Sequence, residues 1–143
     1  MKDIPLVPIS AGALLIALVL FVLIGKRTQA ADANISHITA KEAMALITTN
    51  KGAKNFVILD VRTPNEFAEG HIAGATNIDY YAPDFKERIA KLDKKKTYLI
   101  LCRSGNRSGK SAAFMSESGY TGLFNMKGGM MGWEFDRLPV SRK

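Results

Sequence analysis

The sequence predicts an α/β domain built on an open parallel sheet with helices on both faces. Two continuous apolar runs, FVILDV at 56–61 and YLILC at 98–102, are rich in strand-forming residues and are typical of strands buried on both faces. Segments with helix-start signals alternate with these runs, and this alternation favours a parallel sheet. The chain has 143 residues, of which 47% are hydrophobic and 23% charged, which is sufficient for one folded domain.

Capping boxes mark the beginnings of two helices. Thr39 is followed three residues later by Glu42, and apolar residues then recur at helical spacing up to position 50. Thr63 and Glu66 repeat the pattern after the first strand, with a proline directly after the cap. We therefore expect one short helix before the first strand and another after it.

The remaining elements continue the alternation of strands and helices. In chain order, the pattern predicts a weak strand at 75–78, a helix at 84–92, the strand at 98–102, a helix at 106–118, a last strand at 122–126 and a turn at 128–133. The sequence contains no internal repeat and no low-complexity tract, so we expect a single domain.

The amino-terminal segment differs from the rest of the chain. Residues 4–25 carry no charge, and a helix of this length would span the hydrocarbon core of a bilayer. We therefore expect a transmembrane helix over 1–25, a linker over 26–34 and the folded domain over 35–143. A cleaved signal peptide is the alternative, because small residues near position 30 could form a cleavage site.

The distribution of positive charge predicts the orientation of this single-pass anchor. Lys26, Arg27 and Lys41 follow the apolar run, whereas Lys2 alone precedes it. Since basic residues favour the cytoplasmic side, the folded domain is expected in the cytoplasm. Signal cleavage would instead give a periplasmic or secreted domain.

The composition excludes some kinds of site. The net charge is +7, but the basic residues are scattered, and the densest run, at 91–97, is typical of a solvated loop. We therefore expect no nucleic-acid partner. The single cysteine cannot form an internal disulfide, and His37 and His71 do not form a metal-binding cluster with it, so we expect no metal and no cofactor.

The only cysteine, Cys102, lies where a strand ends and a helix begins. Ligands of open parallel sheets bind at this edge, and the helix N-terminus favours negative charge there. Arg103, Arg107 and Lys110 add positive charge. We therefore expect the pKa of the Cys102 thiol to be lowered and its thiolate to be reactive. A buried cysteine that serves only as a small apolar residue is the alternative.

Two phosphate-binding motifs nearly fit this loop. A nucleotide-binding G-x-x-x-x-G-K-[ST] loop would need glycine at the position of Ser104. Cysteine phosphatases carry C-x5-R, but position 108 is serine and the arginine comes one residue earlier, at 107. The loop is therefore one residue shorter than a phosphatase loop.

The sequence resembles the rhodanese, or thiosulfate sulfurtransferase, domain family. CRSGNRS at 102–108 is similar to the family's active-site loop, C-R-x-G-x-R followed by Ser or Thr. The segment 60–78 resembles the family's D-V-R, E-F and G-H-I-x-G-A-x-N pattern, and 128–133 resembles its terminal G-G-x-x-x-W. The resemblance covers about residues 37–140 and implies a rhodanese-like fold.

The resemblance implies that Cys102 holds a sulfane sulfur as a persulfide and passes it to a thiol, cyanide or a protein acceptor. It also implies that the loop binds a small anionic sulfur donor, with Arg103 and Arg107 on its sulfonate and the backbone N–H groups around the sulfur. The substrate-binding residues are then Arg103, Ser104, Gly105, Asn106, Arg107 and Ser108.

Other residues that match the family pattern are expected to be structural. Asp60 and Arg62 are expected to form an ion pair that braces a loop, His71 to belong to a loop motif, and Trp133 to pack in the core. Two rival functions remain: a phosphatase or arsenate reductase of the same fold, and a rhodanese-like binding module without catalysis.

Overall fold

The computed structural model describes residues 34–142. The predicted anchor at 1–25 and nearly all of the predicted linker at 26–34 lie outside these residues, so both remain predictions. Within 34–142, none of the helices has the length and apolar character needed to cross a bilayer.

Five parallel strands form one sheet, in the order β1-β5-β4-β2-β3. The strands are β1 (Ile35–Ile38), β2 (Phe56–Asp60), β3 (Thr76–Asn77), β4 (Thr97–Leu101) and β5 (Gly122–Met126). The helices are α2 (Ala40–Thr49), α3 (Pro64–Glu69), α4 (Phe85–Ala90), α5 (Asn106–Glu117) and α6 (Gly129–Phe135). The prediction of a parallel α/β sheet is therefore confirmed.

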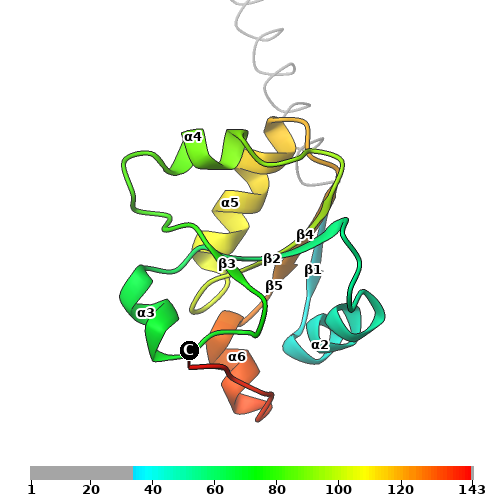
Figure 1. Ribbon diagram of the computed structural model, residues 1–143, viewed down its shortest axis with the longest axis vertical. Coiled ribbons are helices and arrows are strands. Elements are labelled where there is room, and N and C mark those ends of the chain that lie inside the picture. Colours follow the sequence, from blue (N-terminus) through cyan, green and yellow to red (C-terminus); the bar gives the residue numbers. More distant parts are fainter. Residues whose placement is uncertain (1–33, 143) are drawn as a thin grey trace, which may run out of the picture. The chain divides into compact units, whose positions relative to one another are not determined.

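Helices cover both faces of the sheet (Figure 1). On one face, α4 and α5 pack on β-strand side chains that include Leu59, Tyr98 and Ile100. On the other face, α2 and α6 pack on side chains that include Leu99 and Leu101. The alternation along β4 places Cys102, the residue after Leu101, on the α4–α5 side.

Two elements differ from the sequence prediction. The edge strand β1 was not expected, because its four residues, ISHI, are only half-buried at best and mix polar with apolar side chains. The segment predicted as a turn at 128–133 instead begins α6. Gly128 and Gly129 have positive φ, as in a turn, but Met130 and Trp133 then lie one helical turn apart and are buried.

The two predicted capping boxes are present at the starts of α2 and α3. In each, the threonine side chain accepts a hydrogen bond from the N–H of the glutamate, and the glutamate side chain accepts one from the threonine N–H. These contacts explain why both helices begin where the sequence pattern predicts.

A buried ion pair fixes the carboxyl end of β2. Asp60 is fully buried and Arg62 is 5% exposed. The Nη2 group of Arg62 donates to Asp60 Oδ2 (2.6 Å) and to the Gly70 carbonyl (2.8 Å), and Nη1 donates to the Glu66 carbonyl (3.0 Å). Arg62 therefore connects the end of β2 to the backbone of α3 and to the residue that follows this helix.

Replacing Arg62 with alanine should destabilise the domain strongly, because the buried Asp60 carboxylate would lose its partner. We expect a loss of about 3–5 kcal/mol in the free energy of unfolding, measured by urea denaturation. The control is Lys41→Ala, whose ion pair with Asp136 (3.6 Å) has a lysine side chain that is 76% exposed; it should change the free energy little. Equal effects of the two substitutions would contradict the assigned role of Arg62.

Candidate active site

The candidate site is the loop between β4 and α5, residues 102–108. Cys102 is the first residue after β4, and α5 begins at Asn106 as the sequence predicts. Gly105 has φ +95°, a conformation that other residues rarely adopt. This turn folds the loop so that its backbone N–H groups lie around the cysteine side chain.

The Cys102 sulfur accepts hydrogen bonds from this loop. The distance from Gly105 N to Sγ is 3.1 Å, and that from Ser108 Oγ to Sγ is 3.4 Å. Burial of the thiol raises its pKa, but the Ser108 hydroxyl and the N–H groups of Ser108, Ser104 and Gly105 together lower the pKa below its usual value. The direction agrees with the sequence prediction, and hydrogen bonds to the sulfur are its cause.

Cys102 is buried, as its place at the end of an apolar run indicates. The residue is 1% exposed and belongs to the core cluster on the α4–α5 side. It is not an ordinary apolar core residue, however, because hydrogen-bond donors point at its sulfur.

The guanidinium group of Arg107 is already bound within the protein. Its Nη1 and Nη2 groups donate to Glu66 Oε2 (2.8 Å) and Oε1 (2.7 Å), which is a bidentate ion pair. The Tyr81 ring lies 5.4 Å from the guanidinium carbon. Glu66 raises the pKa of Arg107, and the Arg107 hydrogen bonds in turn lower the pKa of Glu66 from 4.5 to about 2.

This ion pair was not foreseen from the sequence. From the sequence, Glu66 was expected only to cap α3. Its carboxylate caps the helix and also binds Arg107. The two residues are 41 positions apart, so no local spacing indicates the contact.

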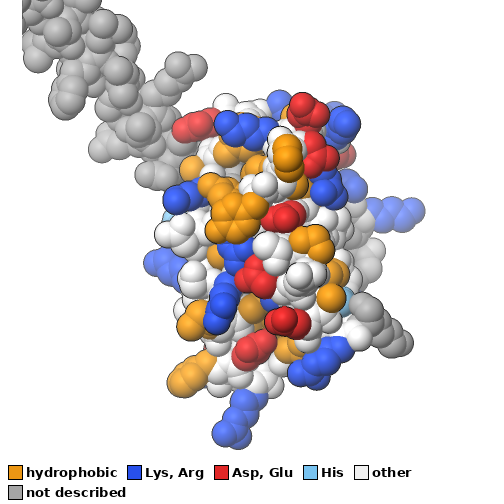
Figure 2. All heavy atoms as spheres, turned by 90° about the vertical axis from the view of Figure 1, so that its left-hand side faces the viewer, with side chains coloured by type: hydrophobic (Ala, Val, Ile, Leu, Met, Phe, Trp, Pro, Cys, Tyr) orange, Lys and Arg blue, Asp and Glu red, His pale blue; other side chains and the backbone are white. Residues whose placement is uncertain are grey.

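Basic, acidic and apolar side chains are intermingled on the face of the molecule seen in Figure 2.

The other predicted loop residues face solvent or support the turn. Arg103, Ser104 and Asn106 are exposed, whereas Ser108 is fully buried. Arg103 makes no ion pair with any residue in 34–142. It lines a pocket of about 210 Å³ together with Arg62, Glu66, Glu69, Met130, Met131 and Glu134.

The first turn of α6 binds the backbone of the loop. Met130 N donates to the Cys102 carbonyl (2.8 Å), and Met131 N donates to the Arg103 carbonyl (3.0 Å). A Cβ atom at Gly129 would collide with the Cys102 carbonyl oxygen and would lie 2.6 Å from the Arg103 carbonyl carbon. Gly129 thus allows α6 to approach the loop carbonyls closely. From the sequence, the two adjacent glycines predicted only a turn.

The remaining predicted residues have structural contacts. Asp60 and Arg62 form the ion pair described above, and Arg62 also borders the pocket that contains Arg103. His71 stacks on Phe67 with ring centroids 3.9 Å apart. Trp133 is 1% exposed, and its Nε1 donates to the Pro139 carbonyl (2.9 Å). Within residues 34–142, no group of three His, Cys, Asp or Glu side chains could hold a metal ion.

Comparison with known proteins identifies relatives for most of the domain. Residues 39–136 match the sequence model of the rhodanese-like domain family. A chloroplastic protein of Arabidopsis thaliana, named thiosulfate sulfurtransferase 16, is 35% identical in an alignment 92 residues long that covers 57% of this chain and 77% of that protein.

Solved structures share the fold. A rhodanese-related protein from Thermoplasma volcanium superposes with a TM-score of 0.62 at 30% identity, covering 76% of this chain and 99% of that one. A Rhodopseudomonas palustris protein of unknown function, described as a possible tyrosine phosphatase, gives 0.66 at 20% identity, covering 98% of this chain and 100% of that one; this second likeness concerns the fold alone. The chain belongs to the rhodanese-like domain family.

Proposed function

We propose that the protein is a sulfurtransferase that moves a sulfane sulfur from a small anionic donor, such as thiosulfate, to a thiol, cyanide or a protein acceptor. Cys102 is the proposed catalytic residue. The observation that carries the proposal is the set of loop N–H groups and the Ser108 hydroxyl that surround Sγ and lower its pKa.

The proposed reaction has two steps and no net oxidation. The Cys102 thiolate attacks the outer sulfur of thiosulfate, the S–S bond of thiosulfate breaks, and sulfite leaves with the electron pair. The acceptor then attacks the outer sulfur of the Cys102 persulfide, and the Cys102 thiolate leaves. Such covalent transfer produces ping-pong kinetics, and the loop N–H groups would stabilise negative sulfur in both steps.

Arg103 is the arginine that we assign to the sulfonate of the donor. Both predicted donor-binding arginines are in the loop, but Arg107 is bound bidentately by Glu66. Arg103 is exposed and makes no ion pair within residues 34–142. Arg107 instead positions the loop by connecting α5 to α3.

The rival functions are weaker. A phosphatase or arsenate reductase would need a wider loop with its arginine free for the oxyanion, whereas Arg107 comes one residue too early and is paired with Glu66. A binding module without catalysis would not require hydrogen-bond donors directed at a cysteine sulfur. Membrane anchoring through residues 1–25 and a cytoplasmic location remain proposals from the sequence.

Incubation with thiosulfate should add one sulfur atom to the wild-type protein and none to Cys102→Ser. The reason is that only a thiolate at position 102 can attack the outer sulfur of the donor. Intact-mass spectrometry measures the adduct, and loss of the added mass with cyanide identifies a persulfide. An unmodified wild type that hydrolyses a phosphate ester in a Cys102-dependent manner would support the phosphatase instead.

Ser108→Ala should raise the pKa of the Cys102 thiol, because the substitution removes a hydroxyl donor from Sγ while burial remains. The pH profile of alkylation by iodoacetamide should move to higher pH. Sulfur transfer at neutral pH should slow roughly tenfold, since a hydrogen bond to a charged group is worth about 1.5–3 kcal/mol.

The matched control for this experiment is Ser104→Ala. Ser104 contributes its backbone N–H to the lowering of the thiol pKa, and that group survives the substitution. An alkylation profile that moves equally in both variants would argue against the role of the Ser108 hydroxyl.

Glu66→Gln should lower the Tm of the domain at neutral pH, and the difference in Tm from the wild type should disappear in acid. Because the folded-state pKa of Glu66 is lowered from 4.5 to about 2, its ion pair stabilises the fold fully above pH 4.5 and ever less as the pH falls toward 2. We expect a Tm about 4–8 °C lower at pH 7, the shift for roughly 1 kcal/mol in a domain of this size, measured by circular dichroism.

Glu69→Gln is the control, because Glu69 is exposed on the same helix and pairs with no cation in 34–142. It should leave Tm nearly unchanged. A Glu66→Gln difference that persists undiminished at pH 3 would refute the assigned ion pair.

A further inference from the structure

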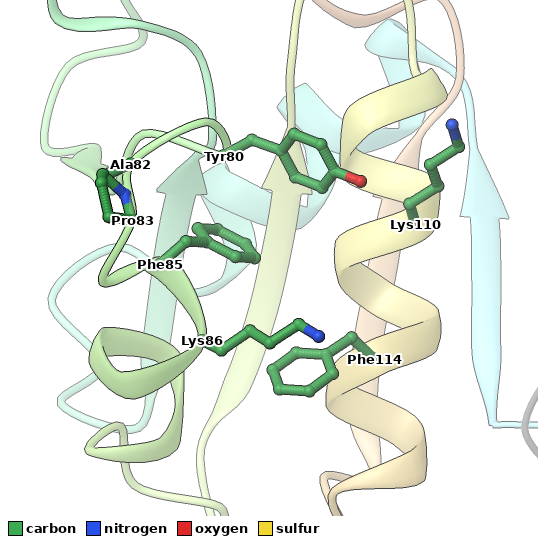
Figure 3. A pocket seen from close by; sticks show the side chains of 7 residues that line it. All are labelled: Tyr80, Ala82, Pro83, Phe85, Lys86, Lys110 and Phe114. Atoms are coloured by element: carbon green, nitrogen blue, oxygen red, sulfur yellow. The ribbon is translucent and has the colours of Figure 1, made fainter.

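A second pocket lies between α4 and α5, here called the α4–α5 groove. Its volume is about 380 Å³, within the range of small-molecule sites. It is lined by Tyr80, Ala82, Pro83, Phe85, Lys86, Lys110 and Phe114 (Figure 3). The groove contains none of the loop residues 102–108.

The walls of the groove are largely aromatic. Phe85 is buried in the core and supports the floor, while Tyr80 and Phe114 are half-buried and present part of their rings to the groove. The Tyr80 and Phe85 ring centroids lie 5.3 Å apart. In Figure 3, Tyr80 extends from the loop before α4 toward α5. These walls would favour a ligand with an apolar, flat body.

All charged residues that line the groove are basic. Lys86 and Lys110 are exposed and approach it from α4 and α5, and no acidic side chain lines it. The Lys86 ammonium lies 5.6 Å from the centre of the Phe114 ring, so positive charge is held directly beside the aromatic wall. The groove therefore favours a ligand that carries a negative charge next to its apolar body.

The groove lies beside the active-site loop. Arg107, Lys110 and Phe114 recur at i, i+3 and i+7 and so share one face of α5. Across from this face, Tyr81 contacts the Arg107 guanidinium and packs edge-on against Tyr80, with centroids 5.4 Å apart. A chain of contacts thus leads from the groove to the first turn of α5, which carries Ser108 and its contact with the Cys102 sulfur.

We propose that the α4–α5 groove binds the sulfur acceptor, and that this acceptor is a small thiol with an aromatic body and a carboxylate. The carboxylate would lie near Lys86 and Lys110, the ring between Tyr80 and Phe114, and the thiol toward the loop. The acceptor thiolate attacks the outer sulfur of the Cys102 persulfide, the S–S bond to Cys102 breaks, and the Cys102 thiolate leaves. The proposal rests on the sulfurtransferase function proposed above.

The experiment compares two acceptors that differ only in charge, 4-mercaptophenylacetate and 4-mercaptophenylacetamide, with thiosulfate as donor. In wild type, KM should be lower for the carboxylate. The Lys86→Ala/Lys110→Ala double variant should raise that KM about tenfold, as expected for two partly screened charge pairs, and leave kcat and the KM of the amide unchanged. The matched control is Lys54→Ala, which removes an exposed lysine from the loop before β2 and should leave the KM of both acceptors unchanged.

A second measurement tests the sulfurtransferase function separately from the acceptor site in the groove. Formation of the Cys102 persulfide, followed by intact mass, should be the same in wild type and in the double variant. If persulfide forms but the two acceptors have equal KM in every variant, the acceptor site is overturned while the sulfurtransferase stands.

If no persulfide forms, direct binding still tests the groove. The thiol-free probe 4-methylphenylacetate should shift the NMR amide signals of Lys110 and Phe114 in wild type and not in the double variant. Shifts that are absent from wild type, or confined to residues outside the groove, would overturn the proposal.

Discussion

Hydrogen-bond donors directed at a buried sulfur are the feature on which the site depends. Burial alone would keep Cys102 protonated, because a thiolate loses solvation in the core. The Gly105 N–H and the Ser108 hydroxyl contact Sγ directly, and the N–H groups of Ser104 and Ser108 add to their effect. The net result is a lowered pKa in a place where water is largely excluded, so each such hydrogen bond counts for more than it would at the surface.

The loop keeps this geometry because α6 and α3 both bind it. The first turn of α6 donates two backbone hydrogen bonds to the loop carbonyls, and Gly129 allows the close approach. Glu66 on α3 fixes Arg107 on α5. The Arg62 ion pair with Asp60 fixes the start of the α3 region in turn. Arg107 therefore helps to fix the loop through Glu66, and it also interacts electrostatically with Cys102.

The sequence predicted those features that local patterns encode. Buried strands at β2 and β4, the two capping boxes and the start of α5 follow from apolar runs and cap residues. The edge strand β1 was not predicted, because its partly exposed residues have no clear pattern. The helix α6 was not predicted either, because two glycines precede Met130 and Trp133 and favour a turn. The Glu66 contact with Arg107 is a tertiary property, so no spacing along the chain could indicate it. The burial of Cys102 agrees instead with its place at the end of an apolar run.

NMR titration of the loop amide protons tests the central claim most directly, because it observes the donors themselves. The account predicts that the amide proton signals of Ser104, Gly105 and Ser108 move downfield together as Cys102 loses its proton, with a common midpoint below the usual cysteine pKa of about 8.5. The movement should vanish in Cys102→Ser. Amide signals that stay fixed through the thiol titration, or a midpoint at or above that of free cysteine, would contradict the account.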